Sequence, residues 1–373
     1  MKKTAAILIF AMLLALLTGC ADGRLPSCML LPTDVPTEAP TEAPTPVPTE
    51  APTPVPTEEP TEEPTEEPTP TPEPTPLPYG LPEGTSEFAF KKVKAAAEAL
   101  DDVLFWVRTQ SLHIDSESYP YEPEDKRAEL SPEAQEYYDE MLAAAEAFED
   151  ITLHGSSEEI SAALEALLFD RTDIETYFTM NEIGDDEWES IIFEPSARYL
   201  KPAEDIDRVK EQVEAFRLVA KYVASNLPEN ISALEKYRIL ASFISDRTSY
   251  AHVLGEIPHY ATGAYGAVVG GGSICQGYTI GFEYLCREAN LYCRRVRNAH
   301  NDDNMHFWNL VKLDQGTYFV DVTWCDGSAY TYEGSYWLKW FMFVFKDDFY
   351  HVPNDGTRTT GKEIILYSMI DPG

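Results

Sequence analysis

Three residues in the last third of the chain have the types and the order needed for covalent catalysis by a thiol. Cys275 follows three glycines and a serine and precedes a segment whose apolar residues have helical spacing. His306 opens the string HFWNLVKL, and Asp321 lies between two valines in the string TYFVDVTW. A thiolate nucleophile needs a base, and the base needs an acid that orients it. A charge between two valines is costly unless it has a partner.

The segment around Cys275 allows two interpretations. Apolar residues at helical spacing predict a helix that ends near Asn290, so Cys275 lies in its first turn. Unpaired backbone N–H groups and the helix dipole favour a thiolate there. The alternative is a small buried residue that only packs, and this segment alone does not separate the two.

The spacing of His306 and Asp321 can be tested against hairpin geometry. If Asp314 and Gln315 form a two-residue loop, Leu313 pairs with Gly316. Asp321 then becomes the diagonal neighbour of His306 on the same face, about 7–8 Å away between backbones. A three-residue loop would put the two side chains on opposite faces. We expect the first register.

These strings resemble the transglutaminase-like family, which shares the Cys, His, Asp order of the papain-like cysteine peptidases. The matching motifs are CQGY at 275–278, HFWN at 306–309 and YFVDVTW at 318–324. The resemblance is strongest over 246–327, with weaker similarity in ALLFDRTDIETYF and LEKYRILASFISDRTSY upstream. Phe307 replaces the usual alanine, and Cys325 replaces the usual acid after the Thr-Trp pair.

The resemblance implies a thioester mechanism on a protein or peptide substrate, with cell-wall peptide included. Cys275 attacks a carboxamide or peptide carbonyl, His306 exchanges the proton and Asp321 holds the imidazole. The Cys275 backbone N–H stabilises the oxyanion, with Tyr265 as a possible second donor. Acyl transfer to an amine and hydrolysis use the same residues, so the sequence does not divide a transferase from a peptidase. A non-catalytic binding or cell-wall-associated module that retains the fold is the alternative.

No cofactor, metal or nucleic acid is expected. The string HNDDNMH at 300–306 lacks a recognised ligand spacing, and no Cys-x-x-Cys occurs. The formal net charge of −36 argues against nucleic acid as a partner. Cys286 and Cys293 are interpreted as core residues, and a disulfide between them stays open.

The helices and strands expected around these residues indicate an α+β protein. Helical patterns cover 87–110, a segment after Ser131-Pro132, a segment after Ser156, 203–226 and 232–245. Capping-box patterns open the helices at Ser156 and Ser232. Strand-like runs cover 176–192, 292–297, 306–313, 317–324 and 337–345. With the family resemblance, we expect a helical N-terminal region followed by a papain-like core, in which the helix after Cys275 packs on an antiparallel sheet.

The chain is expected to have four parts. Residues 1–20 resemble a lipoprotein signal peptide that ends in Leu-Thr-Gly-Cys, so Cys20 is the predicted lipidation site and membrane anchor. Residues 21–84 form a spacer whose Pro-Thr-Glu repeat cannot bury enough apolar area to fold. Residues 85–200 are mainly helical, and 201–373 form the transglutaminase-like domain. The predicted location is extracytoplasmic, at a bacterial cell surface.

Overall fold

The computed structural model describes residues 78–109, 116–175, 177–184, 186–192, 200–201, 206–251, 257–298, 305–326 and 353–354. The expected signal peptide, Cys20, the Pro-Thr-Glu repeat and the expected strand at 337–345 lie outside these ranges. The described residues combine helices with antiparallel sheets, so the α+β class is confirmed. No helix among them combines the length and the apolar character needed to cross a bilayer.

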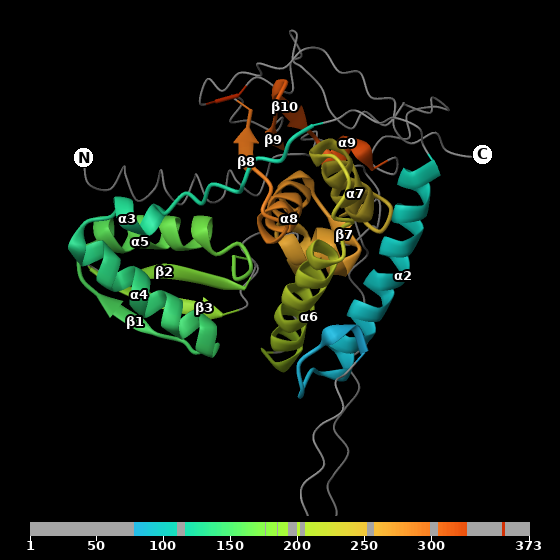
Figure 1. The fold of residues 1–373 in the computed structure, drawn as a ribbon. Helices are drawn as coiled ribbons and strands as arrows, with labels where there is room; N and C mark the ends of the chain where they lie inside the picture. The colour runs from blue at the N-terminus through green and yellow to red at the C-terminus, as the bar shows by residue number, and fades with distance from the viewer. Residues whose placement is uncertain are drawn as a thin grey trace, which may run out of the picture. The chain divides into compact units, whose positions relative to one another are not determined.

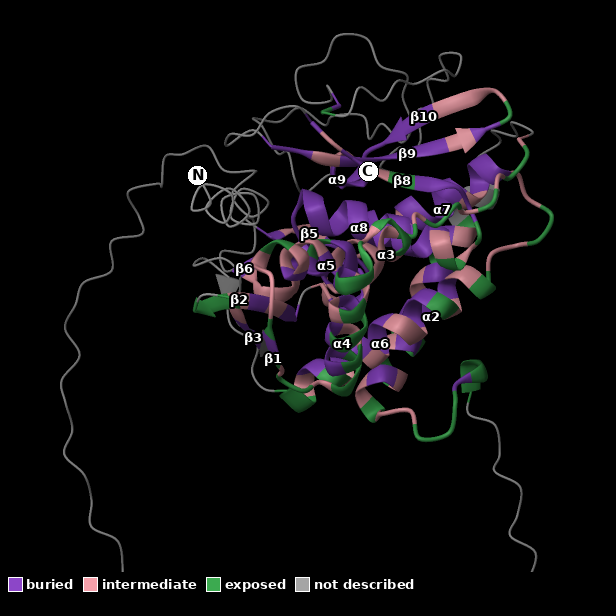
Figure 2. Ribbon diagram, turned by 90° about the vertical axis from the view of Figure 1, so that its left-hand side faces the viewer, coloured by how far each residue is buried: buried purple, intermediate pink, exposed green. Residues whose placement is uncertain are grey.

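Four helices form the main helical layer: α2 (Glu87–Thr109), α6 (Ile206–Ser225), α7 (Ala233–Ser245) and α8 (Cys275–Glu288). The helix α2 packs on α6 and α7, and α8 packs on α6 and α7 as well as on the sheet that follows it (Figure 1). The first twelve residues of α8 are all buried, so it is the central helix of this layer (Figure 2).

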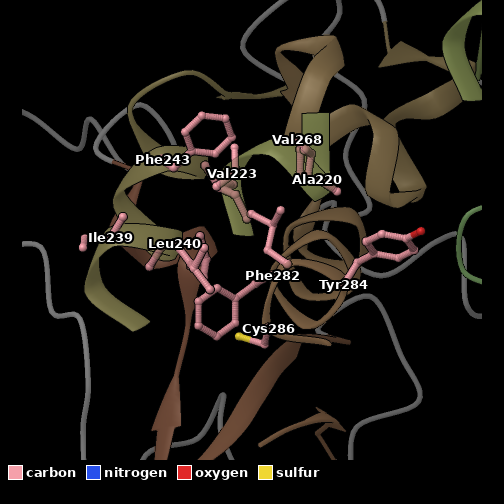
Figure 3. Close-up of a cluster of buried hydrophobic side chains, with 14 of the residues drawn as sticks. Ala220, Val223, Ile239, Leu240, Phe243, Val268, Phe282, Tyr284 and Cys286 are labelled. Atoms are coloured by element: carbon pink, nitrogen blue, oxygen red, sulfur yellow. The ribbon is translucent and has the colours of Figure 1, made fainter. Parts of the chain in front are cut away.

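The core of this layer is built from aliphatic and aromatic side chains of α6, α7 and α8. Figure 3 shows Phe282 beside Leu240, with Cys286 one turn further along α8. All three side chains are fully buried. Burying a side chain the size of Phe282 stabilises a fold by roughly 1.5–3 kcal/mol. Packing of α8 is therefore a large part of what holds the layer together.

The sheet after α8 has the order β10–β9–β8 and is antiparallel throughout. Its strands are β8 (Cys293–Arg297), β9 (Phe307–Leu313) and β10 (Gly316–Val320). Leu313 pairs with Gly316 across a two-residue loop, which confirms the predicted register. Gly316 has φ of 134°, a backbone conformation that side chains with a Cβ rarely adopt.

The predicted strand at 317–324 is wrong beyond Val320. The chain turns there into the short helix α9 (Val322–Cys325). Asp321 causes this turn, because its side chain accepts a hydrogen bond from the Trp324 N–H and caps the helix. The strand-like alternation of residues around Asp321 therefore gave no sign of its role as a helix cap.

A second hydrophobic cluster lies earlier in the chain. It is formed by a sheet of order β1–β3–β2, two helices that pack on each other and two residues of α6. Its elements are α4 (Pro132–Ala147), β1 (Thr152–His154), α5 (Ser157–Asp170), β2 (Phe178–Gly184) and β3 (Glu187–Ile192), and the short helix α3 (Lys126–Glu129), which has no buried residue, packs on α5. Strands β2 and β3 confirm the strand-like run at 176–192.

The helix caps divide into formed and unformed ones. Ser131 and Ser232 accept hydrogen bonds from backbone N–H groups, and Ser232 completes a capping box with Glu235. Ser156 makes no side-chain cap bond, so the capping box predicted there is wrong. Its expected partner Glu159 accepts instead from the Ser131 hydroxyl at 2.5 Å.

Short elements fix the chain that leads into α8. Strand β5 (Ser249–Tyr250) pairs in parallel with β7 (Gly272–Ser273), and β4 (Leu200–Lys201) pairs in parallel with β6 (Ile257–Pro258). A 3-10 helix, η4 (His259–Thr262), precedes a π-helical turn, η5 (Gly266–Gly270). A further 3-10 turn, η2 (Pro78–Gly80), precedes α2. Strand pairings therefore fix the chain before η4 and the glycines that directly follow η5.

Candidate active site

Cys275 is the first residue of α8. Ile274 before it is extended, and Cys275 itself is 1% exposed. Gly277 lies within this first turn, where an added Cβ would come 2.5 Å from the Ala261 carbonyl oxygen and 2.9 Å from that of Gly263. Glycine is therefore required in the CQGY string, because the first turn of α8 packs directly against backbone. The sulfur is held at a rigid helix start.

His306 and Asp321 form a buried pair. The His306 Nε2 lies 2.5 Å from Asp321 Oδ2, and the two residues are 4% and 0% exposed. The second carboxylate oxygen, Oδ1, accepts from the Trp324 N–H at 3.2 Å. A carboxylate acceptor places the imidazole proton on Nε2, so Nδ1 is the ring atom on the opposite side.

Two indole rings and one asparagine fix the His306 ring. The Trp308 and Trp324 ring centroids lie 6.1 and 6.2 Å from that of the imidazole. The His306 backbone N–H donates to Asn298 Oδ1 at 3.1 Å, and the Asn298 N–H donates to the His306 carbonyl at 3.0 Å. His306 is therefore oriented by the Asp321 carboxylate, by the two indole rings and by its backbone hydrogen bonds with Asn298.

Contacts along α8 show which end of the sheet Cys275 approaches. Late in α8, Cys286 hydrogen-bonds Cys293, whose partner across the sheet is Val311. Two turns earlier in α8, the Thr279 carbonyl accepts from Asn309 Nδ2 at 3.1 Å. The first residues of α8 and of β9 therefore lie at the same end of the two packed elements.

Cys275 and His306 accordingly lie at the same end of the α8–β9 pair. Cys275 is four residues before Thr279, about 6 Å along a helix. His306 is three residues before Asn309, about 10 Å along a strand. A second tie comes from Tyr278, whose hydroxyl hydrogen-bonds Asp326 at the end of α9. Two hydrogen bonds therefore tie the first half of α8 to the segments on either side of the His306–Asp321 pair, β9 and the end of α9.

Tyr265, the expected second oxyanion donor, precedes η5. Its ring meets that of Tyr260 edge-on at 5.1 Å, and burial raises the pKa of its hydroxyl. The charged neighbour that lowers this pKa is Arg208 of α6. The role of Tyr265 stays a prediction.

The remaining cysteines are buried thiols. Burial raises the pKa of Cys293 well above its usual range, and the hydrogen bond that its thiol donates to Cys286 raises it further. A buried thiol with a raised pKa is chemically inert, which fits packing. Cys286, Cys293 and Cys325 all belong to the same core cluster. No disulfide joins the four cysteines of the described residues, Cys275 included.

Sequence reasoning missed two site residues. Gln276, directly after Cys275, donates through Nε2 to Glu175 Oε1 at 3.0 Å. Glu175 lies between α5 and β2, in the second cluster of the chain. Burial raises the pKa of the Glu175 carboxyl to about 7. The pair is separated by 101 residues, so no local pattern pointed to it.

The arrangement contains no group of three or more potential metal ligands within the residues that the structure describes. His300 of the HNDDNMH string lies outside them. The comparison with known proteins adds no family to this geometry, since neither a family model nor a curated protein matches the sequence.

Proposed function

We propose that this protein is a thiol-dependent acyltransferase or peptidase of the transglutaminase-like kind, acting on protein or peptide amides. The observation that carries the proposal is the buried His306–Asp321 pair at 2.5 Å, at the same end of the sheet as the helix start with Cys275. An acid that orients a histidine near a cysteine at a helix start is the arrangement that nucleophilic catalysis needs.

The first half-reaction forms a thioester. The Cys275 thiol gives its proton to His306 Nδ1, and the sulfur attacks the amide carbonyl carbon. The carbon–nitrogen bond then breaks, and the imidazolium returns the proton to the leaving amine. Asp321 keeps the Nε2 proton in place and stabilises the imidazolium. The Cys275 backbone N–H supports the oxyanion of the intermediate.

The second half-reaction decides the class. An amine that attacks the thioester gives a new amide, and water gives an acid. In both cases His306 takes the proton from the attacking group, and Cys275 is regenerated. A fluorescent primary alkylamine offered with glutamine-containing peptides distinguishes the two. Incorporation of the amine identifies a transferase, whereas hydrolysed peptide without incorporation identifies a hydrolase.

The test of the nucleophile is site-specific labelling. A thiol-reactive chloroacetamide probe at mildly acidic pH should label Cys275 selectively, as read by peptide mapping. The Cys275→Ala variant should lose this label, and Cys325→Ala should keep it. Equal labelling of the wild type and Cys275→Ala would overturn the proposal.

The deep burial of the three proposed catalytic residues favours a second candidate function, that of a non-catalytic binding module. Cys275, His306 and Asp321 are each less than 5% exposed. A covalent acyl intermediate trapped on Cys275 from a peptide library supports turnover. Reversible peptide binding that is unchanged in Cys275→Ala supports the binding module instead.

Location is the third part of the proposal. The charged and apolar leader ending in Leu-Thr-Gly-Cys, followed by the Pro-Thr-Glu repeat, supports lipid anchoring through Cys20 and a spacer that carries the domain away from the membrane. Metabolic labelling with a fatty-acid analogue should mark the wild type and not Cys20→Ser. Labelling of both would place the lipid elsewhere.

A further inference from the structure

A carboxyl group from the second cluster reaches the residue beside the proposed nucleophile. Glu175 lies in the turn between α5 and β2, and its Oε1 accepts from Gln276 Nε2 at 3.0 Å. Gln276 is the second residue of α8 and follows Cys275 directly. The early region of the chain therefore contacts the first turn of α8 through a titratable group.

Among the described residues, the cation that attracts Glu175 is Arg295, which is also paired with a second acid. Arg295 of β8 places its Nε 2.7 Å from Glu283 Oε2 and stacks on the Phe169 ring at 4.1 Å. Its Nη2 also donates to the Phe169 carbonyl at 2.8 Å. Arg295 attracts Glu175 electrostatically, and Glu283 repels it. Around Glu283 itself the other charges are Arg287, Arg294 and Glu124.

Burial, the shared cation and one hydrogen bond set the proton affinity of Glu175. Removal from water raises its pKa to about 7, with the repulsion from Glu283 adding to it. The attraction of Arg295 and the Gln276 hydrogen bond act in the opposite direction. A carboxyl with this pKa changes its charge within the pH range in which proteins work.

The two side chains keep unused acceptors. Glu175 Oε2 and Gln276 Oε1 are buried and have no hydrogen-bond partner among the described residues. An ionised carboxylate only accepts, so it selects the amide orientation that points Nε2 toward it. A protonated carboxyl can also donate, and the Gln276 carbonyl oxygen can then accept a hydrogen bond from it. The pair thus has two arrangements, and the proton on Glu175 selects between them.

We propose that Glu175 is a positioning residue of the candidate active site: its ionised carboxylate holds the Gln276 amide, and with it the first turn of α8 that carries Cys275, in one arrangement that protonation releases. This role rests on the proposed thiol chemistry at Cys275. It also gives the early region of the chain a function at the site.

The first test observes Gln276 directly. The chain has only five glutamines, so glutamine-selective ¹⁵N labelling of the full chain gives five side-chain amides to assign. The Gln276 amide should shift with pH with a midpoint near 7 in the wild type and in Cys275→Ala, but not in Glu175→Gln. Gln135, which donates to the Leu130 carbonyl, is the internal reference. A shift that persists in Glu175→Gln, or no shift in the wild type, would overturn the role.

The second test measures the thiol. Glu175→Gln keeps an acceptor for Gln276 without a charge, whereas Glu175→Ala removes both. Alkylation of Cys275 by iodoacetamide at pH 8 should slow about tenfold in Glu175→Ala, and by a smaller factor in Glu175→Gln, because a neutral amide can accept from Gln276 and also donate to it, as a protonated carboxyl does. The rate–pH profile of Glu175→Gln should also lose the step near pH 7. Parallel profiles for all three proteins would mean that Glu175 is only structural.

The two proposals fail separately. The Gln276 shift and the alkylation rates need no substrate and no turnover. A chain that shows them but forms no acyl intermediate contradicts the proposed function alone. A chain that turns over a peptide without the Gln276 titration contradicts the positioning role alone.

Discussion

The two ends of α8 each carry a cysteine, and their surroundings differ. At the start, Cys275 is followed by Gln276 with its bond to Glu175, and the His306–Asp321 pair lies at the same end of the sheet. At the other end, Cys286 packs into the core and hydrogen-bonds Cys293. One helix therefore joins a polar end to an apolar end.

Under the proposed function, the neighbours of the two thiols, and not their burial, distinguish the reactive cysteine from the one that only packs. Cys275 and Cys286 are both about as buried as a side chain can be, at 1% and 0% exposed. A glutamine–carboxyl pair and a histidine–carboxylate pair lie at the end of α8 that carries Cys275, whereas the hydrogen-bond partner of Cys286 is another buried thiol. The experiments below compare the two ends.

The largest effect is expected from removing the sulfur at the polar end. Cys275→Ala should lower peptide turnover by at least about 10⁴-fold, because no other group can form the thioester. Cys286→Ala is the matched change at the apolar end and should leave turnover per folded molecule unchanged. Turnover with a peptide library measures both. Equal losses in the two variants would remove the distinction between the ends.

Next in size is the loss of the acid behind the base. Asp321→Asn should lower the labelling rate of Cys275 by about 10³-fold, because an amide favours the wrong imidazole tautomer. Asparagine still caps a helix well, so the melting temperature should change little. Asp314→Asn in the exposed hairpin loop is the control. An unchanged labelling rate in Asp321→Asn would separate the His306–Asp321 pair from the thiol.

A change at the apolar core of α8 should affect stability alone. Phe282→Ala removes a fully buried ring and should lower the free energy of unfolding by about 3–4 kcal/mol. Denaturant unfolding measures this loss, and Cys275 labelling under native conditions measures the other end. A drop in labelling as large as that of Asp321→Asn would show that the two ends are coupled through the core.

The smallest effect concerns pH at the polar end. An acid whose pKa is raised by folding binds its proton more tightly in the folded state, so its contribution to stability is lost as pH rises from the unfolded pKa of about 4.5 to about 7. Glu175→Gln removes this loss and should be more stable than the wild type by about 3 kcal/mol at pH 8, with little difference at pH 4. A constant difference across this range would contradict the raised pKa.

Local patterns in the sequence predicted much of the fold. The helix from Cys275 and the hairpin register followed from apolar spacing and from a loop with room for two residues. The register placed His306 and Asp321 directly beyond the same end of the hairpin, where Nε2 and Oδ2 lie 2.5 Å apart. These features depend on residues close together in the chain, which is why they were accessible.

Other features depend on choices between competing local structures or on distant contacts. Asp321 fits a strand by its neighbours, but its carboxylate caps α9 and ends the strand instead. Ser156 fits a capping box, but Glu159 bonds Ser131 of another helix start. Glu175 meets Gln276 only because two clusters of the fold come together. No pattern within a short window contains that information.

Asp321 has two tasks, since one carboxylate oxygen holds His306 and the other caps α9. An aspartate at this position in a related chain would therefore not indicate activity. An inactive relative would still need it, because the helix cap of α9 depends on the same carboxylate. Cys275 and His306 are the positions whose loss would mark such an inactive lineage. A survey of natural variants should weigh those two positions before the aspartate.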